Sequence, residues 1–159
     1  MAGWGRPTRT ERYLQKPVNR RYIELLLHQI IIMDQEIYSK VWHTKGVFTI
    51  ATPGLLILEN GNVSFITEAG EQFRVPVAEI KEVKWPLMLF GLGFKAMING
   101  QKYTLTFMKG ASDPELDDTT LDQFSRLTSI GRGVDSIETL ANWGKSKQSA
   151  KQWKAVLGG

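Results

Sequence analysis

The stretch GLLILENGNVSFIT, residues 54–67, decides how this chain is expected to fold. It contains two apolar runs, 54–59 and 62–67, which are rich in β-forming residues and are separated by Asn60-Gly61. Asn-Gly between two such runs indicates a tight hairpin, because a type I′ turn needs a positive φ at both central residues. The stretch therefore predicts a pair of antiparallel strands.

The same pattern continues on both sides of this hairpin. Further short runs of β-formers predict strands over 47–51, 72–77, 80–85, 94–98 and 102–108. A second Asn-Gly pair, at 99–100, joins the last two of them. In the last strand Tyr103, Leu105 and Phe107 alternate with Lys102, Thr104 and Thr106, which is the period of a strand with one buried face. Seven closely spaced strands predict an antiparallel barrel or sandwich.

Helices are expected on either side of the strands. Apolar residues within 20–43 recur at helical spacing and predict one amphipathic helix, with β-structure at Leu25–Leu27 and Ile30–Ile32 as the alternative. Thr120 and Gln123 have the spacing of a capping box and predict the start of a helix that contains Phe124. The fold class is therefore α+β.

A length of 159 residues suits one compact domain with appendages. We expect a basic flexible arm over 1–19, the amphipathic helix over 20–45, the β-domain over 46–132 and a lysine-rich helical tail over 133–159. The formal net charge of +4 comes from the two ends, because residues 1–21 carry +5 and the last fifteen carry +4. Basic ends can contact the phosphates of lipids or nucleic acids, or they can simply keep the chain soluble.

The sequence gives no sign of a reaction. Without cysteine, the chain has no disulfide, no thiolate metal site and no cysteine nucleophile. His28 and His43 lack the spacing of metal ligands, and the Gly91-Leu92-Gly93 stretch lacks the following helix that a dinucleotide site needs. We expect no enzyme activity, no cofactor and no metal.

The chain shows no recognisable signal for secretion or for membrane insertion. The apolar run over 23–33 is too short to span a membrane and is not followed by a cleavage site for secretion. We expect a cytoplasmic protein that can also associate peripherally with a membrane.

Three stretches together resemble the bacterial pleckstrin-homology-like (PH-like) and GRAM-type domains. These are the Gly54-led hairpin, the run VPVAEIKEV at 75–83 and the hairpin over 93–107. The resemblance covers roughly residues 46–130 and implies a seven-stranded barrel with a C-terminal capping helix. It also implies a non-catalytic binding module that docks a protein partner or an anionic lipid surface.

Candidate contact residues follow from position. Basic residues at or near strand ends are candidates for binding a phosphate group: Lys45, Arg74, Lys84, Lys95 and Lys109. In the tail, candidates for contact with a membrane or partner are Trp143, Lys147, Lys151, Trp153 and Lys154. The alternative is that the tryptophans pack on the barrel while the lysines stay in water.

Two other functions remain open at this point. The basic termini could bind nucleic acid, and the helix over 20–43 could assemble a homo-oligomeric structural protein.

Overall fold

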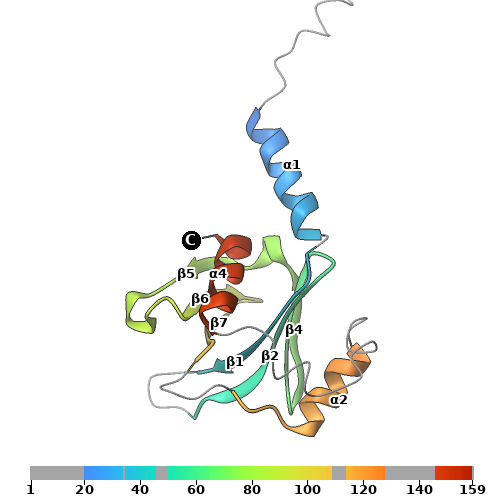
Figure 1. The fold of residues 1–159 in the computed structure, drawn as a ribbon, viewed down its shortest axis with the longest axis vertical. Helices are drawn as coiled ribbons and strands as arrows, with labels where there is room; N and C mark the ends of the chain where they lie inside the picture. The colour runs from blue at the N-terminus through green and yellow to red at the C-terminus, as the bar shows by residue number, and fades with distance from the viewer. Residues whose placement is uncertain (1–19, 34, 46–49, 109–113, 128–145, 159) are drawn as a thin grey trace, which may run out of the picture. The chain divides into compact units, whose positions relative to one another are not determined.

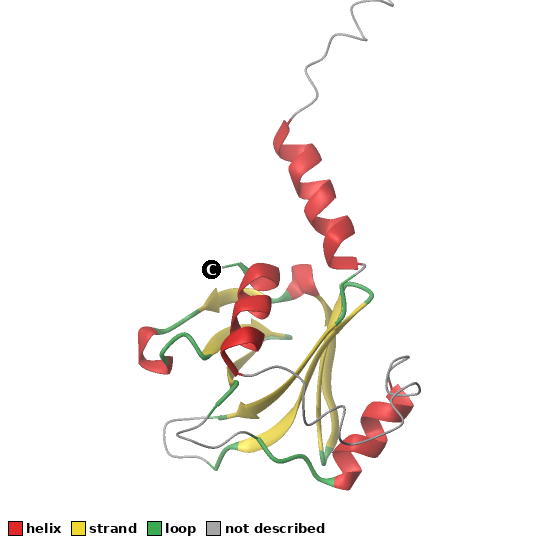
Figure 2. Ribbon diagram, in the orientation of Figure 1, coloured by secondary structure: helices red, strands yellow, loops and turns green. Residues whose placement is uncertain are grey.

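A computed structural model describes five stretches of the chain, which are residues 20–33, 35–45, 50–108, 114–127 and 146–158. The chain divides into two compact units, Met1–Ile31 and Ile32–Gly159. All that is described of the first unit belongs to helix α1 (Arg20–Met33), whose last two residues fall in the second unit. Helices and strands both occur, so the fold class is α+β, as expected (Figure 2).

The second unit is built on a seven-stranded antiparallel sheet in the order β4-β3-β2-β1-β7-β6-β5 (Figure 1). Its strands are β1 (Ile37–His43), β2 (Thr52–Glu59), β3 (Asn62–Thr67), β4 (Gly70–Pro76), β5 (Lys81–Lys84), β6 (Gly93–Ile98) and β7 (Gln101–Thr106). Short 3-10 helices, η1 (Val77–Glu79) and η2 (Leu87–Leu89), precede and follow β5. Strands β4 and β5 are the two edges of the sheet.

Both Asn-Gly hairpins are confirmed. Asn60 and Gly61 have φ angles of 50° and 73°, and Asn99 and Gly100 have φ angles of 49° and 74°. Positive φ at both central residues matches the right-handed twist of the flanking strands. These two turns fix β2 against β3 and β6 against β7.

The prediction of one helix over 20–43 is wrong beyond Met33, where α1 ends. Residues 37–43 form β1, and its side chains alternate between buried and half-buried positions. Of the strand expected over 47–51, only Ile50 and Ala51 are described, and they lie outside any strand. The number of strands is seven as expected, but the first of them comes before residue 46 rather than after it.

The sheet separates into two halves at the junction of β1 and β7. Strand β1 pairs with β2 along its whole length, from Ile37 opposite Leu58 to His43 opposite Thr52. It pairs with β7 only at its end, through Trp42 opposite Thr106 and His43 opposite Leu105. The start of β1 therefore parts from β7, and apolar side chains of both halves fill the space between them.

Helix α4 (Ser146–Leu157) completes this core. Ala150, Trp153 and Val156 lie on one side of the helix and join the buried cluster formed by β1–β4, β6 and β7. Trp153 has no exposed surface, and its indole N–H donates a 3.0 Å hydrogen bond to the Oγ of Ser39 in β1. Apart from Ile32 at the end of α1, the helical residues of the main core thus come from α4, in the expected tail, and not from the segment around Phe124.

Helix α2 (Asp118–Leu127) covers the other face of the sheet. Its Phe124 packs on Leu55, Ile57 and Ile66 in a separate apolar cluster. The expected capping box is wrong, because the Oδ1 of Asp117, and not the side chain of Gln123, accepts the hydrogen bond from the Thr120 backbone N–H at 2.6 Å. This is ordinary N-capping by an aspartate. The Gln123 side chain instead donates to the Glu68 carbonyl at 3.2 Å.

Candidate functional site

A groove with a volume of about 760 Å³ lies on the half of the sheet formed by β5, β6 and β7. Outward-facing residues of these strands contribute to its lining, together with the η2 turn and the residues that follow β1 and β7. Its lining residues are Thr44, Lys45, Glu82, Lys84, Met88, Leu89, Phe90, Leu92, Lys95, Ala96, Met97, Lys102, Tyr103, Thr104, Thr106 and Met108.

Strand register brings the polar residues of the groove into one row. Lys84 of β5 lies opposite Lys95 of β6, and Lys95 lies opposite Thr104 of β7. The Thr104 carbonyl accepts a 3.0 Å hydrogen bond from the backbone N–H of Thr44, which directly precedes Lys45. Neighbouring strands are about 4.8 Å apart, so this row crosses the sheet with a polar side chain at each step.

The groove is strongly basic. Of the residues that the structure describes, four lysines, Lys45, Lys84, Lys95 and Lys102, and one acidic residue, Glu82, line it, which gives a formal charge of +3. The ion pairs found among the described residues involve none of these lysines. Like charges directly opposite each other on a sheet destabilise it, so the Lys84–Lys95 pair costs free energy that a bound anion would offset.

Two nearby titratable groups add no charge of their own at neutral pH. Burial raises the pKa of Tyr103, which keeps its phenol protonated. Burial and, to a smaller extent, the charge of Lys45 lower the pKa of His43. The His43 ring stacks on Tyr103 with ring centroids 5.0 Å apart, and it stays neutral at pH 7. The lysines therefore set the electrostatic potential of the groove.

One wall of the groove is apolar. It is formed by Met88, Leu89, Phe90 and Leu92, on and after the η2 turn. Thr44, Thr104 and Thr106 also line the groove and bring hydroxyl groups to it. Hydroxyls and ammonium groups are donors for phosphate oxygens, whereas a thioether and a phenyl ring suit an apolar chain. The groove thus offers complementary surfaces to a molecule that is anionic at one end and apolar at the other.

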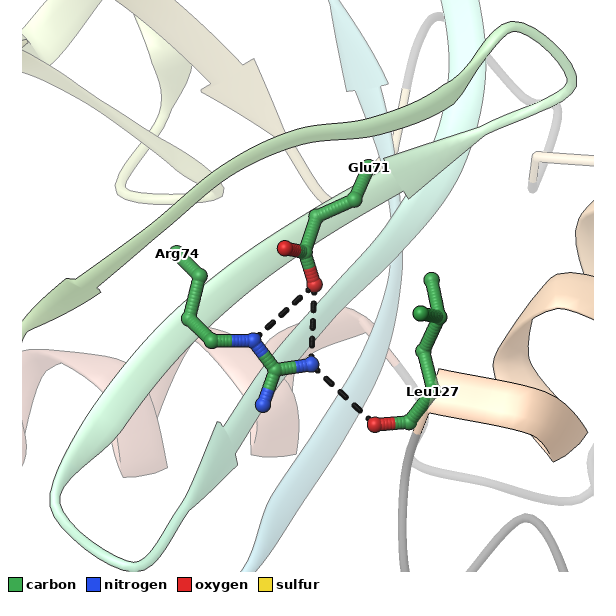
Figure 3. A network of polar contacts seen from close by, with 3 residues as sticks. All are labelled: Glu71, Arg74 and Leu127. Atoms are coloured by element: carbon green, nitrogen blue, oxygen red, sulfur yellow. Dashed lines mark hydrogen bonds and ion pairs between the residues drawn. The ribbon is translucent and has the colours of Figure 1, made fainter.

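Three of the five expected phosphate-binding residues, Lys45, Lys84 and Lys95, meet in this groove. Arg74 does not, because its guanidinium donates to the Oε2 of Glu71 at 2.8 and 3.0 Å and to the carbonyl of Leu127 at 3.1 Å (Figure 3). It connects β4 to the last turn of α2 and caps a helix C-terminus. Lys109 lies outside the described residues.

The candidate contact residues of the tail differ in their exposure. Trp153 is buried in the core, so the interpretation that it packs on the sheet holds. Lys147, Lys151 and Lys154 are exposed on α4, and the Lys154 ammonium lies 6.0 Å from the centroid of the Trp85 ring. Trp143 lies outside the described residues.

The sequence-based list missed Lys102, Met88 and Phe90, which also line the groove. Lys102 carried a usable signal, since it shares the outward set of the last strand with Thr104 and Thr106. Met88 and Phe90 carried none, because their place on the wall depends on how the loop between β5 and β6 folds back.

Comparison with protein-family models, with curated proteins and with solved structures finds no match for this chain. None of the helices that the structure describes is long and apolar enough to cross a membrane. Among the same residues, no cluster of three or more histidine, aspartate or glutamate side chains could hold a metal ion.

Proposed function

We propose that this chain is a non-catalytic, PH-like binding module that docks on an anionic membrane surface through the basic groove. Two features of the fold support the PH-like assignment. The strands run in an up-and-down order in which β1 also meets β7, and a C-terminal helix packs into the core between the two halves. The sequence resemblance implies seven strands and a C-terminal capping helix within residues 46–130, whereas here the first strand and the helix in the core lie outside that range.

The observation that carries the function is the Lys84–Lys95 pair in a groove whose described lining has a formal charge of +3. Two lysines in direct register, without a described carboxylate partner, are an arrangement that an anionic ligand stabilises. Among the described residues, the groove lining has no histidine and a single carboxylate, so it offers binding groups rather than an acid–base pair. Binding is therefore the activity that its chemistry supports best.

A membrane fits this groove better than a soluble anion or a nucleic acid. The lysines give affinity for any phosphate, but the apolar wall at Met88 and Phe90 has no counterpart on a phosphate backbone. A lipid surface presents both a layer of anionic headgroups and an apolar interior. An acidic protein partner is the competing occupant and is an outcome of the test below.

Sedimentation with vesicles tests the proposal. The full chain should bind vesicles that contain phosphatidylserine, and salt should weaken this binding because it screens charge. A lysine near an anionic bilayer contributes about 1 kcal/mol. The double variant Lys84→Glu, Lys95→Glu should therefore bind at least about thirtyfold more weakly.

The matched control carries the same change in charge on α4, as Lys147→Glu, Lys151→Glu. Both residues are exposed and neither lines the groove. An equal loss in the two double variants would show that net charge, or contact through the α4 lysines, governs binding rather than the groove. Absence of wild-type binding to anionic vesicles, together with binding to an acidic peptide, would replace the membrane with a protein partner.

A further inference from the structure

The turn between β5 and β6 exposes three large apolar side chains next to the groove. Leu87, Met88 and Phe90 have 92%, 73% and 87% of their surface exposed. Single exposed apolar residues are common on protein surfaces, but three within four positions form a patch, and exposed patches mark contact sites. Exposure of this apolar surface to water is unfavourable. The turn is therefore a candidate for a contact that buries the three side chains.

The turn is an ordered structure. The backbone N–H of Leu89 donates a hydrogen bond to the Pro86 carbonyl at 3.0 Å. The backbone N–H of Phe90 donates one to the Leu87 carbonyl at 2.8 Å. Phe90 and Gly91 then adopt positive φ angles of 51° and 70°, which turn the chain back toward the sheet. Local hydrogen bonds thus define the shape of the turn before any partner binds.

Both ends of the turn are attached to the rest of the second unit. On one side, the indole N–H of Trp85 donates a 3.0 Å hydrogen bond to the Gly158 carbonyl after α4. On the other side, the Leu92 carbonyl accepts a 2.8 Å hydrogen bond from the backbone N–H of Phe107. A turn held in this way loses little conformational entropy on binding, so burial of its side chains contributes more fully to affinity.

Charge around the turn identifies its occupant. Lys84 and Lys95 lie on the adjacent strands, and Met88 and Phe90 line the same groove as these lysines. An apolar tip bordered by lysines matches the two layers of a membrane surface, in which anionic headgroups lie above acyl chains. A symmetric contact between two copies would instead bring two basic grooves together and would be repelled by their charge.

We propose that Leu87, Met88 and Phe90 insert into the acyl layer of the membrane while the groove lysines remain at the level of the headgroups. This inference rests on the proposed function and adds a step to it. The groove alone would give a purely electrostatic, salt-reversible association. Insertion of the turn would make part of the binding independent of salt, because burial of apolar surface is not screened.

The absence of cysteine allows a direct test with single-cysteine variants. Leu87→Cys, labelled with an environment-sensitive nitrobenzoxadiazole dye, reports on the turn, and labelled Ala69→Cys, exposed in the turn between β3 and β4 at the other edge of the sheet, is the control. With phosphatidylserine vesicles, the label at 87 should shift to shorter wavelength and be quenched by lipids with a spin label in the acyl chain. The label at 69 should show neither change.

A binding measurement completes the test. The variant Leu87→Ser, Met88→Ser, Phe90→Asn removes the apolar tip, and asparagine is chosen at 90 because it tolerates positive φ. It should bind anionic vesicles at least about tenfold more weakly than the wild type, and its remaining binding should disappear in high salt.

The outcomes separate this inference from the function on which it rests. If the wild type binds anionic vesicles but the label at 87 stays in water and the triple variant binds equally well, insertion is refuted while groove binding stands. If the wild type does not bind at all, both proposals fail. If the label at 87 shifts without lipid as protein concentration rises, a second copy covers the turn and the inference is overturned.

Discussion

Replacement of Trp153 by alanine should destabilise the protein more than any change on the exposed side of the same helix. Trp153 has no exposed surface and lies in the core cluster between the two halves of the sheet. Truncation of a buried tryptophan to alanine costs about 3–5 kcal/mol, from lost burial and from the cavity that remains. Since domains of this kind unfold with about 5–15 kcal/mol, the loss would be a large part of the total stability.

The indole hydrogen bond can be measured separately by a double-mutant cycle. Ser39→Ala leaves the Trp153 N–H buried without its acceptor, and Trp153→Phe leaves the Ser39 hydroxyl without its donor. Each single change should cost about 1–3 kcal/mol. The double variant should cost less than the sum by about 1 kcal/mol, because it removes both partners at once.

Urea unfolding followed by far-ultraviolet circular dichroism is the suitable assay, since tryptophan fluorescence would change with the substitution itself. Gln152→Ala is the matched control, because this residue is exposed on the same helix and should change the free energy of unfolding by less than about 0.5 kcal/mol. A value for Trp153→Ala within 1 kcal/mol of the control would refute the conclusion that α4 belongs to the core.

Two further predictions concern backbone packing and pH. Gly54→Ala should destabilise by about 2 kcal/mol or more in the same urea assay, because an added Cβ would lie 2.5 Å from the Ile66 carbonyl oxygen. Gly100→Ala meets no atom within 4 Å and should cost only about 1 kcal/mol, because alanine is strained at the positive φ of 74°. For His43, whose pKa is lowered in the folded state, stability should be complete above the ordinary value of 6.5 and should fall as the pH drops below it. The slope is at most about 1.4 kcal/mol per pH unit, and His43→Phe should lack it between pH 7 and 5.5; parallel curves for the two proteins would contradict this account.

The parts of the fold that could be predicted are those fixed by local chemistry. Each Asn-Gly pair demands positive φ at two positions, and few structures other than a hairpin supply that. Between the hairpins, runs of β-branched and aromatic residues alternate with turn residues at short, regular intervals. Local signals of this kind were sufficient for the α+β class and for six of the seven strands.

Strand β1 could not be recognised because two of its four inward positions are polar. Ile37 and Val41 point into the core as expected of a strand, but Ser39 and His43 occupy the alternate inward positions. Ser39 is accommodated by the indole N–H of Trp153, which lies 114 residues further along the chain. His43 is accommodated by stacking on Tyr103. Without those distant partners, the pattern of residues 37–43 is closer to a helix than to a buried strand.

The sequence pattern also could not show which of the two helices, α2 or α4, packs into the main core. Both α2 and α4 are amphipathic, and each presents an aromatic residue on its apolar side, so periodicity alone does not distinguish them. The distinction comes from the part of β1 that is not paired with β7, where the buried Ser39 hydroxyl accepts its hydrogen bond from the Trp153 indole. Only a residue with both a large apolar surface and a donor group satisfies that position, and Trp153 has both.

The groove could be predicted residue by residue but not as a site. A lysine near a strand end is ordinary on its own, and Lys45, Lys84 and Lys95 come from three different segments of the sequence. Antiparallel register places Lys84 opposite Lys95, and the meeting of β1 with β7 brings Lys45 beside the same row. Register also explains why Arg74 is excluded, since β4 is the far edge of the sheet and offers it Glu71 and the end of α2 instead. The sheet thus brings together lysines that are far apart in the sequence. Their positive charge in one groove is the reason to expect an anionic binding partner there.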